Sequence, residues 1–265
     1  MEHTKQLGEA KISKLLIKFS VPAVVGMMVN ALYNVVDRIF VGHGVGFQGL
    51  AGITICFPIM LVMMAFGMLI GLGATALVSI RLGEQKFKEA EQILGNAMTL
   101  IVFLSVTLAL FGLGFMDTLL RWCGASEAIL PVARDYLRII LWGSVFQQIG
   151  FGMNNFIRAE GNPKIAMFTM LIGAALNTIL DPVFIFVLDM GVAGAAWATI
   201  ISQLVSAVWV LWYYLGGQSS LKLHLRNLKL HGEIVGKILA LGSAPFAMQI
   251  AASAINIVLN NSLVK

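Results

Sequence analysis

Charge is the scarcest feature of this sequence. Only 12% of its 265 residues are charged, whereas about 25% is usual for a soluble domain. At the same time 58% of the residues are hydrophobic and the mean hydropathy is +0.87. Because so few charged side chains cannot cover the surface of a water-soluble protein of this length, the sequence predicts an integral membrane protein.

Cysteine and histidine are also rare. Cys56 falls in an apolar run and Cys123 in a predicted loop, so neither a disulfide framework nor a metal cluster is expected. All four histidines lie in loops or in the amino-terminal tail: His3, His43, His224 and His231. An intramembrane enzyme would need a nucleophile–base pair or a metal set, such as histidine with carboxylates, inside the apolar runs. The sequence therefore argues against an enzyme, and no cofactor is expected.

Long apolar runs make up most of the chain. Runs long enough for a helix to cross a bilayer, which takes about 20 residues, occur seven times, at roughly 15–41, 50–80, 92–116, 134–157, 165–188, 192–215 and 235–264. The second run is too long for an upright helix, so it is expected to tilt or to project beyond the bilayer. Spacings such as Gly67-x-x-x-Gly71 and Gly191-x-x-Gly194 favour close packing of helices. The predicted fold is an all-α bundle in the membrane.

Basic residues gather at the ends of the apolar runs, so the net charge of +5 indicates topology rather than nucleic-acid binding. They are concentrated before the first run and in the loops that follow the second, fourth and sixth runs: Lys5, Lys11, Lys14, Lys18, Arg81, Lys86, Lys88, Arg158, Lys164, Lys222, Arg226, Lys229 and Lys237. This distribution predicts a cytoplasmic amino terminus. The first residues show no small-residue cleavage pattern, so no cleaved signal peptide is expected.

The start of the chain is repeated near its end. At an offset of 223, Lys14, Leu16, Ser20 and Pro22 match Lys237, Leu239, Ser243 and Pro245, and Asp37 aligns with Asn260. Six apolar runs, a basic connection and a second copy of the first run are the plan of a transporter built from two parallel six-helix halves. The expected divisions are a cytoplasmic segment at 1–14, a six-helix lobe at 15–215, a cytoplasmic amphipathic linker at 216–234, and the first helix of an incomplete second lobe at 235–265.

The fifth apolar run contains the most informative polar residues. Asn177 and Asp181 are four residues apart, which puts an amide and a carboxylate on one face of a helix. Pro182 follows at once and removes the donor that would have bonded the carbonyl of Thr178. A carboxylate in hydrocarbon is costly, and such residues generally mark a site for a cation or a proton.

Other polar residues are expected near the same depth. In the first run Asn30, Asn34 and Asp37 form one helical stripe, with Tyr33 one turn before Asp37. Asp37, Asp181 and Thr199 of the sixth run are each expected about 10–12 Å below the outer boundary at the helical rise of about 1.5 Å per residue. In the fourth run Gln147 and Gln148 fit this level, whereas Asn154 and Asn155 lie too close to the inner end. The predicted cluster is Asp37, Asn177, Asp181 and Thr199, with a glutamine as a further candidate.

Two carboxylates in a dry site repel each other unless a proton or a cation neutralises them. The ion is expected to be either H⁺ or Na⁺, the latter held by carboxylate, amide and hydroxyl oxygens. Structural roles are the alternatives. Asp37 could pair with Arg38, Thr199 could bond its own backbone, and Asn30 and Asn34 could join helices.

Four stretches together resemble a known family. PAVVGMMVNALYNVVDRIFVG, RAEGNPKIAM, LNTILDPVFIF and GVAGAAWATIISQ are similar, in this order, to the multidrug and toxic compound extrusion family in its bacterial branch. The resemblance implies a twelve-helix exporter with two lobes, which expels organic and often cationic compounds in exchange for Na⁺ or H⁺. It also implies a multi-pass protein of the bacterial inner membrane whose missing carboxyl-terminal lobe would belong to the full-length protein.

The same resemblance implies roles for particular residues. The family's ion-site positions fall on Asp37, Asn177, Asp181 and Thr199, and a first-helix proline that bends in some members corresponds to Pro22. A fourth-helix asparagine matters in some members, and either Asn154 or Asn155 could be its counterpart. Further contacts to ion or substrate are expected from Tyr33, Asn34, Gln147, Gln148 and Asn154.

The sequence therefore predicts a secondary antiporter for a small organic substrate, with membrane lipid around it and no nucleic-acid partner. The alternatives are a flippase for lipids or lipid-linked sugars of the same superfamily, a non-transporting scaffold, and an inactive fragment of a longer transporter. A flippase would favour a cavity lined by basic residues, and none is evident in the middle of the predicted membrane spans.

Overall fold

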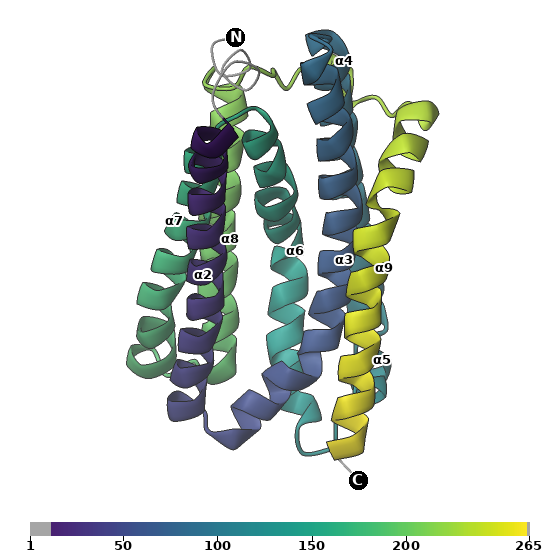
Figure 1. Cartoon of the computed structure of the whole chain (residues 1–265). Helices are drawn as coiled ribbons and strands as arrows, with labels where there is room; N and C mark the ends of the chain where they lie inside the picture. Colours follow the sequence, from purple (N-terminus) through teal and green to yellow (C-terminus); the bar gives the residue numbers. More distant parts are fainter. Residues whose placement is uncertain (1–11, 264–265) are drawn as a thin grey trace.

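The computed structural model describes residues 12–263, and it is a bundle of long helices (Figure 1). The helices are α2 (Ile12–Gly44), α3 (Phe47–Gly83), α4 (Phe87–Gly114), α5 (Met116–Trp122), α6 (Leu130–Ala159), α7 (Pro163–Pro182), α8 (Gly191–Leu215) and α9 (Gly232–Leu263). The prediction of an all-helical membrane fold is confirmed. Most of the predicted cytoplasmic segment 1–14 lies outside the described residues.

All seven predicted spans are helices, but one differs in character. Six helices in the described part of the chain are long and apolar enough to cross a membrane, and α6 is not among them. Gln147, Gln148, Asn154 and Asn155 make α6 more polar than the others. Figure 1 shows why this is tolerated, since α6 lies in the middle of the bundle and packs against α3, α4, α7 and α8.

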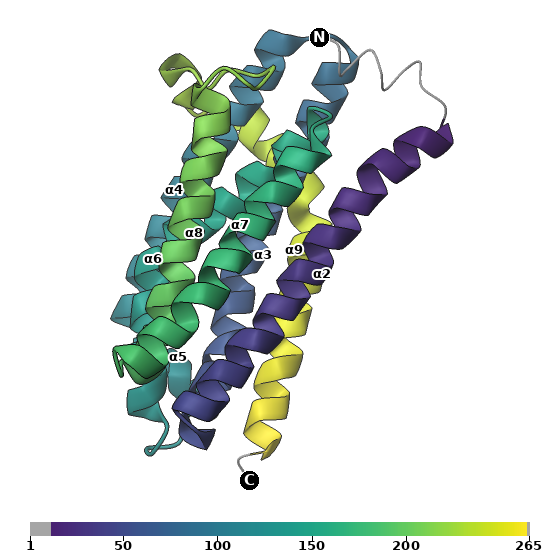
Figure 2. The same cartoon turned by 90° about the vertical axis from the view of Figure 1, so that its left-hand side faces the viewer.

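The helices form two groups on either side of α6. On one side α2 packs against α7, which packs against α8, and on the other side α9 packs against α3 and α3 against α4. The two perpendicular views show α2 along one edge of the bundle, with much of its length uncovered (Figures 1 and 2). Apolar side chains on this uncovered face include Val24 (52% exposed), Met28 (59%) and Leu32 (60%).

Glycines allow the closest helix contacts, in agreement with their spacing in the sequence. A Cβ on Gly71 of α3 would lie 3.0 Å from the Cα of Gly152 in α6. Where α3 meets α9, a Cβ on Gly242 would lie 1.8 Å from the carbonyl oxygen of Leu69, and one on Gly73 would lie 2.1 Å from that of Ile238. No side chain fits at these crossings, so the helix backbones touch directly.

Pro182 changes the helical geometry at the end of α7. The α-helix continues to Pro182 and then widens into a π-helical turn, η1 (Val183–Val187). A proline has no N–H to donate to the preceding turn, which explains why the regular pattern changes here. Such π-turns occur frequently at functional sites, and this one begins two residues after Asp181.

The linker between α8 and α9 is attached to the bundle. It contains one short 3₁₀ turn, η2 (Leu225–Leu228), and α9 begins at Gly232, three residues earlier than expected. Asn96 of α4, fully buried, donates to the carbonyls of Asn227 (3.3 Å) and Lys229 (3.2 Å) and accepts from the N–H of His231 (2.8 Å). The linker is therefore fastened to the bundle.

A second attachment of the linker centres on Glu160, in the turn between α6 and α7. Its buried carboxylate accepts hydrogen bonds from the hydroxyl groups of Ser219 (2.7 Å) and Tyr213 (3.3 Å) and from the N–H of Ser220 (2.8 Å). Burial raises the pKa of Glu160 from 4.5 to about 7, although these hydrogen bonds act in the opposite direction. The start of the linker thus depends on one partly protonated carboxyl group.

Polar bonds fix the position of α9 along α3. Pro58 in α3 cannot donate to the carbonyl of Thr54, and the side chain of Asn260 in α9 donates to that carbonyl instead (3.4 Å). Ser253 donates to the carbonyl of Pro58 itself (2.8 Å). Asn260, which aligns with Asp37 in the internal repeat, therefore holds two helices together.

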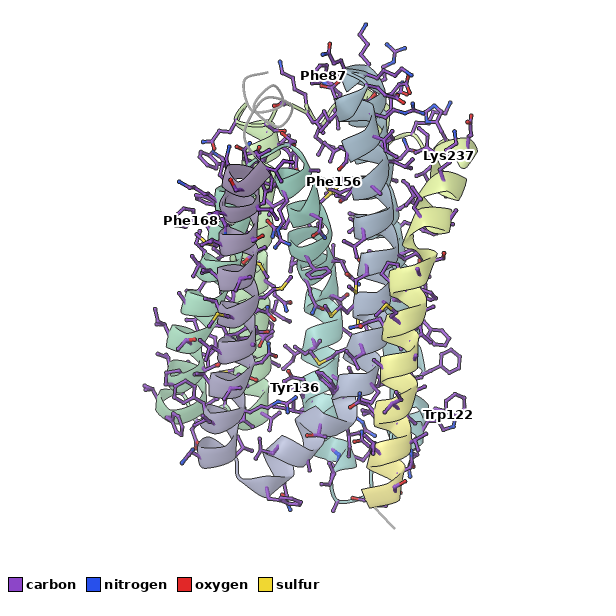
Figure 3. All side chains as sticks on the ribbon, in the orientation of Figure 1. Phe87, Trp122, Tyr136, Phe156, Phe168 and Lys237 are labelled. Carbon is purple, nitrogen blue, oxygen red and sulfur yellow. The ribbon has the colours of Figure 1, made fainter. Side chains whose placement is uncertain are left out.

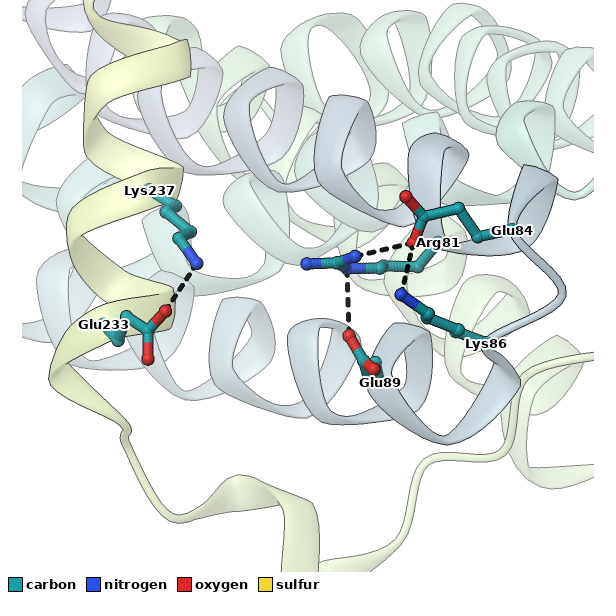
Figure 4. A network of polar contacts seen from close by, with 6 residues as sticks. All are labelled: Arg81, Glu84, Lys86, Glu89, Glu233 and Lys237. Carbon is teal, nitrogen blue, oxygen red and sulfur yellow. Dashed lines mark hydrogen bonds and ion pairs between the residues drawn. The ribbon is translucent and has the colours of Figure 1, made fainter.

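Exposed ion pairs cover the turn between α3 and α4 (Figure 4). Arg81 pairs with Glu84 (2.6 Å) and Glu89 (3.0 Å), and Lys86 reaches Glu84 (3.1 Å). On α9, Lys237 pairs with Glu233 (2.5 Å). These charges lie at the same end of the bundle as the linker (Figures 1 and 4), which is the end predicted to face the cytoplasm.

Candidate ion-binding site

The carboxyl-terminal turns of α7 present an amide and a carboxylate to α8. The Nδ2 atom of Asn177 lies 3.2 Å from Oδ1 of Asp181 and 3.4 Å from Oγ1 of Thr199. All three side chains are buried, with exposed fractions of 2%, 0% and 6%. The spacing of four residues on one helix explains the first contact, and the packing of α7 against α8 supplies the second.

Asp37 reaches the same place from α2. Its carboxyl group lies against that of Asp181, close enough for the two to share a hydrogen bond when one carries a proton. The two acids are 144 positions apart in the chain (181 − 37), and the packing of α2 against α7 brings them together. The structure therefore places Asp37, Asn177, Asp181 and Thr199 in one cluster.

Oxygen atoms in this cluster lack partners. Oδ1 of Asp37, Oδ1 of Asn177 and Oδ2 of Asp181 are each buried without a hydrogen-bond donor. Buried polar atoms are nearly always paired, because leaving one unpaired costs about 1–3 kcal/mol. Three such oxygens on residues of one cluster suit a ligand that accepts electron pairs, namely a proton or a small hard cation.

The donor set also indicates which kind of ion fits. Carboxylate, amide and hydroxyl oxygens are hard ligands, which suit Na⁺ or other hard cations rather than soft transition metals. Within residues 12–263, no group of three or more histidine, cysteine or acidic side chains could hold a metal ion. The oxygen ligands of the cluster fit a hard cation or a proton.

Two tyrosines lie within electrostatic range of the acids. Tyr33 of α2, a candidate from the sequence, and Tyr136 of α6 are both close enough for the charges of Asp37 and Asp181 to act on their hydroxyl groups. Figure 3 labels Tyr136 in the half of the bundle where α2 joins α3. Sequence reasoning missed Tyr136, because it follows Asp135 near the start of its helix and shares no polar stripe with the other site residues.

The other candidates from the sequence have different partners. Asn34 donates to the carbonyl of Asn30, one turn earlier on α2. Gln148 donates to the carbonyl of Met63 in α3, and Asn154 donates to that of Ala166 in α7 (3.2 Å). Gln147 is partly buried, and no polar bond joins its side chain to the cluster. Gln148 and Asn154 therefore connect helices, whereas Asn34 bonds only within α2.

Pro22 lies inside α2, which continues through it as one helix of 33 residues. Its side chain is buried, and the repeat-related Pro245 likewise lies inside α9. The bending expected from the family resemblance remains a prediction.

Comparisons with known proteins identify relatives of this chain. The sequence profile of the family described as MatE matches residues 22–183, more than half of the chain. The multidrug export protein MepA of Staphylococcus aureus (strain MRSA252) is 27% identical over 252 residues, which cover 95% of this chain and 56% of MepA. The protein of that name from Staphylococcus haemolyticus is 28% identical over the same shares.

Solved structures agree with this result. A chain described as protein A is 42% identical and superposes with a TM-score of 0.92 over 98% of this chain and 58% of its own. A multidrug resistance MATE family transporter of the MOP superfamily, in an outward-facing conformation, is 30% identical with a TM-score of 0.87, covering 94% and 55%. This chain thus spans little more than half the length of the relatives it matches. It belongs to the MatE family of multi-pass membrane transporters.

Proposed function

We propose that this chain forms the ion-coupling lobe of a secondary antiporter, which expels organic compounds in exchange for Na⁺ or H⁺. The coupling ion binds at Asp37, Asn177, Asp181 and Thr199. The observation that carries this proposal is the group of three buried oxygens without donors, on two carboxyl groups and one amide. The names of the relatives, which are multidrug exporters, support the substrate class.

The mechanism follows from repulsion between the two acids. When both are ionised, Asp37 on α2 and Asp181 on α7 repel each other across a dry contact, which favours separation of the helices. A bound cation or proton removes the repulsion and draws α2 towards α7. Because the bound and empty states then prefer different arrangements of α2, ion binding can shift a conformational equilibrium.

A second lobe is needed to complete the transport path. We propose that an organic substrate binds between this lobe and a repeat-related one that begins with α9, and that movement of α2 alters this cavity. The amino terminus is proposed to face the cytoplasm of a bacterium, with the protein in the inner membrane. The outward half of the membrane would then contain the ion site.

Efflux by the full-length protein in everted membrane vesicles tests this function, with Na⁺ and pH gradients imposed separately. Asp37→Asn and Asp181→Asn are expected to abolish the dependence of efflux on either gradient, because each substitution removes one of the two charges that the ion neutralises. Asp189→Asn is the matched control. Asp189 is an exposed acid on the loop before α8 and takes no part in the cluster.

The purified chain offers a second measurement that needs no transport. If the cluster binds Na⁺, added NaCl stabilises the wild type against thermal unfolding more than equal KCl does, and the two site variants lose this difference. Normal gradient-driven efflux by both Asp37→Asn and Asp181→Asn would remove the proposal. An effect of Asp189→Asn equal to theirs would show that the loss reflects surface charge instead.

A further inference from the structure

A groove lies between the outer ends of α2 and α3, separate from the acidic cluster. Its volume is about 610 Å³, within the range of about 300–1,000 Å³ usual for small-molecule sites. Its walls come from both helices: Val35, Arg38, Ile39, Gly42, His43, Leu50, Ile53 and Thr54. The five α2 residues follow the spacing of one helix face, so one continuous surface of α2 lines the groove.

The charge in this groove is positive. Arg38 lines the groove in a largely aliphatic wall, and its guanidinium lies 5.6 Å from the ring centre of Phe57 on α3. In residues 12–263, no carboxylate forms an ion pair with Arg38, although its charge acts on the neighbouring Asp37, whose carboxyl group lies against that of Asp181. The contact with Phe57 is a cation–π interaction, which leaves the N–H groups available to an anion.

The remaining polar side chains of the groove bond the backbone of their own helices. His43 bonds the carbonyl of Ile39 through Nδ1 (2.8 Å), and because a carbonyl only accepts, Nδ1 is the protonated nitrogen. Thr54 donates its hydroxyl to the carbonyl of Leu50 (2.8 Å). Arg38 is therefore the group that selects the charge of a ligand, and Val35, Ile39, Leu50 and Ile53 select its apolar part.

The position of the groove suits a ligand from the membrane boundary. Arg38 is six residues before the end of α2 (44 − 38), which places it about 9 Å from that end at a rise of about 1.5 Å per residue. A charged head at this depth lies near the water interface, while an aliphatic tail can follow the helices inward. Ile39 is 49% exposed, so the apolar wall is open to such a tail.

We propose that this groove binds an amphiphile with one anionic head group and an aliphatic tail. The guanidinium of Arg38 pairs with the carboxylate or phosphate, and the apolar wall of α2 and α3 contacts the tail. Two sources share this chemistry, namely a phospholipid of the surrounding bilayer and a free single-chain amphiphile. The proposal concerns equilibrium binding and does not depend on ion-driven antiport.

Two probes of equal tail length test the selection of charge. Dodecanoate and dodecyltrimethylammonium are titrated into the purified chain in maltoside detergent, and binding is followed by thermophoresis. Dodecanoate is expected to bind the wild type and to bind Arg38→Gln at least ten-fold more weakly, whereas the cationic probe shows no dependence on Arg38. Arg226→Gln is the matched control, because Arg226 is an exposed basic residue on the linker at the opposite end of the bundle.

Native mass spectrometry with phosphatidylglycerol and phosphatidylcholine distinguishes the two sources. Phosphatidylglycerol adducts that disappear in Arg38→Gln support a membrane lipid as the ligand, and dodecanoate binding without such adducts supports a free amphiphile. Equal binding of both probes, or binding that is the same in wild type and Arg38→Gln, would overturn the proposal. Because the antiport is tested with Asp37 and Asp181 variants under ion gradients, either hypothesis can fail while the other stands.

Discussion

Replacing Asn96 with alanine should release the end of the linker from α4. The side chain is fully buried, donates to the carbonyls of Asn227 and Lys229, and accepts the N–H of His231. The same amide also donates to the carbonyl of Gln92 in its own helix (2.9 Å), so about two bonds to the linker are lost. At about 1 kcal/mol for each hydrogen bond, local opening of the linker becomes easier by roughly 2 kcal/mol. Since about 1.4 kcal/mol is tenfold in an equilibrium constant, opening becomes roughly 30-fold more frequent.

Amide hydrogen exchange measures this opening directly. In Asn96→Ala, the exchange of the His231 N–H should accelerate by that factor, while the N–H of Lys222, which bonds the carboxylate of Glu91 (3.0 Å), should change less. Asn256→Ala is the control, because its amide bonds only its own helix, at the carbonyl of Ala252 (2.8 Å). Unchanged exchange at His231 would refute the view that Asn96 holds the linker.

Two further predictions concern helix packing and pH. Gly242→Ala should destabilise the folded state by roughly 1–3 kcal/mol or more through overpacking, because its Cβ would meet the carbonyl of Leu69. The unfolding temperature in detergent should therefore fall. Gly236→Ala is the control, because its Cβ would have nothing within 4 Å, and it should not lower this temperature. Equal effects of the two would contradict the close contact of α9 with α3. The raised pKa of Glu160, about 7 against 4.5, means that the folded state holds this proton more tightly than the unfolded chain. The resulting contribution to the free energy of unfolding is about 3 kcal/mol, is full below about pH 4.5 and is lost as the pH rises through 7. The wild type should therefore be more stable at pH 5 than at pH 8, and this difference in the free energy of unfolding should be smaller in Glu160→Gln.

Much of the fold could be predicted because a helix that crosses a bilayer needs a run of about 20 apolar residues. Seven apolar runs became seven helices, and glycine spacings such as that at Gly71 marked real backbone contacts. Boundaries were less accurate where polar residues support a helix, as at Gly232, where α9 begins before its apolar run. In contrast, α6 is more polar than the other long helices, and this is tolerated because neighbouring helices surround it.

The candidate site was partly accessible for the same reason. Asp37, Asn177, Asp181 and Thr199 could be grouped by depth alone, since acids and amides are rare inside the membrane. Depth could not reveal lateral position, so Gln148 fitted the expected level although it bonds the backbone of α3. Side-chain direction and neighbouring helices decide such cases, and neither is readable from spacing within one helix.

The contact between α9 and α3 has a consequence for the order of assembly during synthesis. The carbonyl of Thr54, left without a helical donor by Pro58, receives its bond from a residue made 206 positions later. Until α9 enters the bilayer, this face of α3 exposes an unsatisfied backbone group to lipid, which is costly in hydrocarbon. The nascent protein therefore passes through a stage in which this part of α3 must be covered by the insertion machinery or by other helices, before α9 arrives.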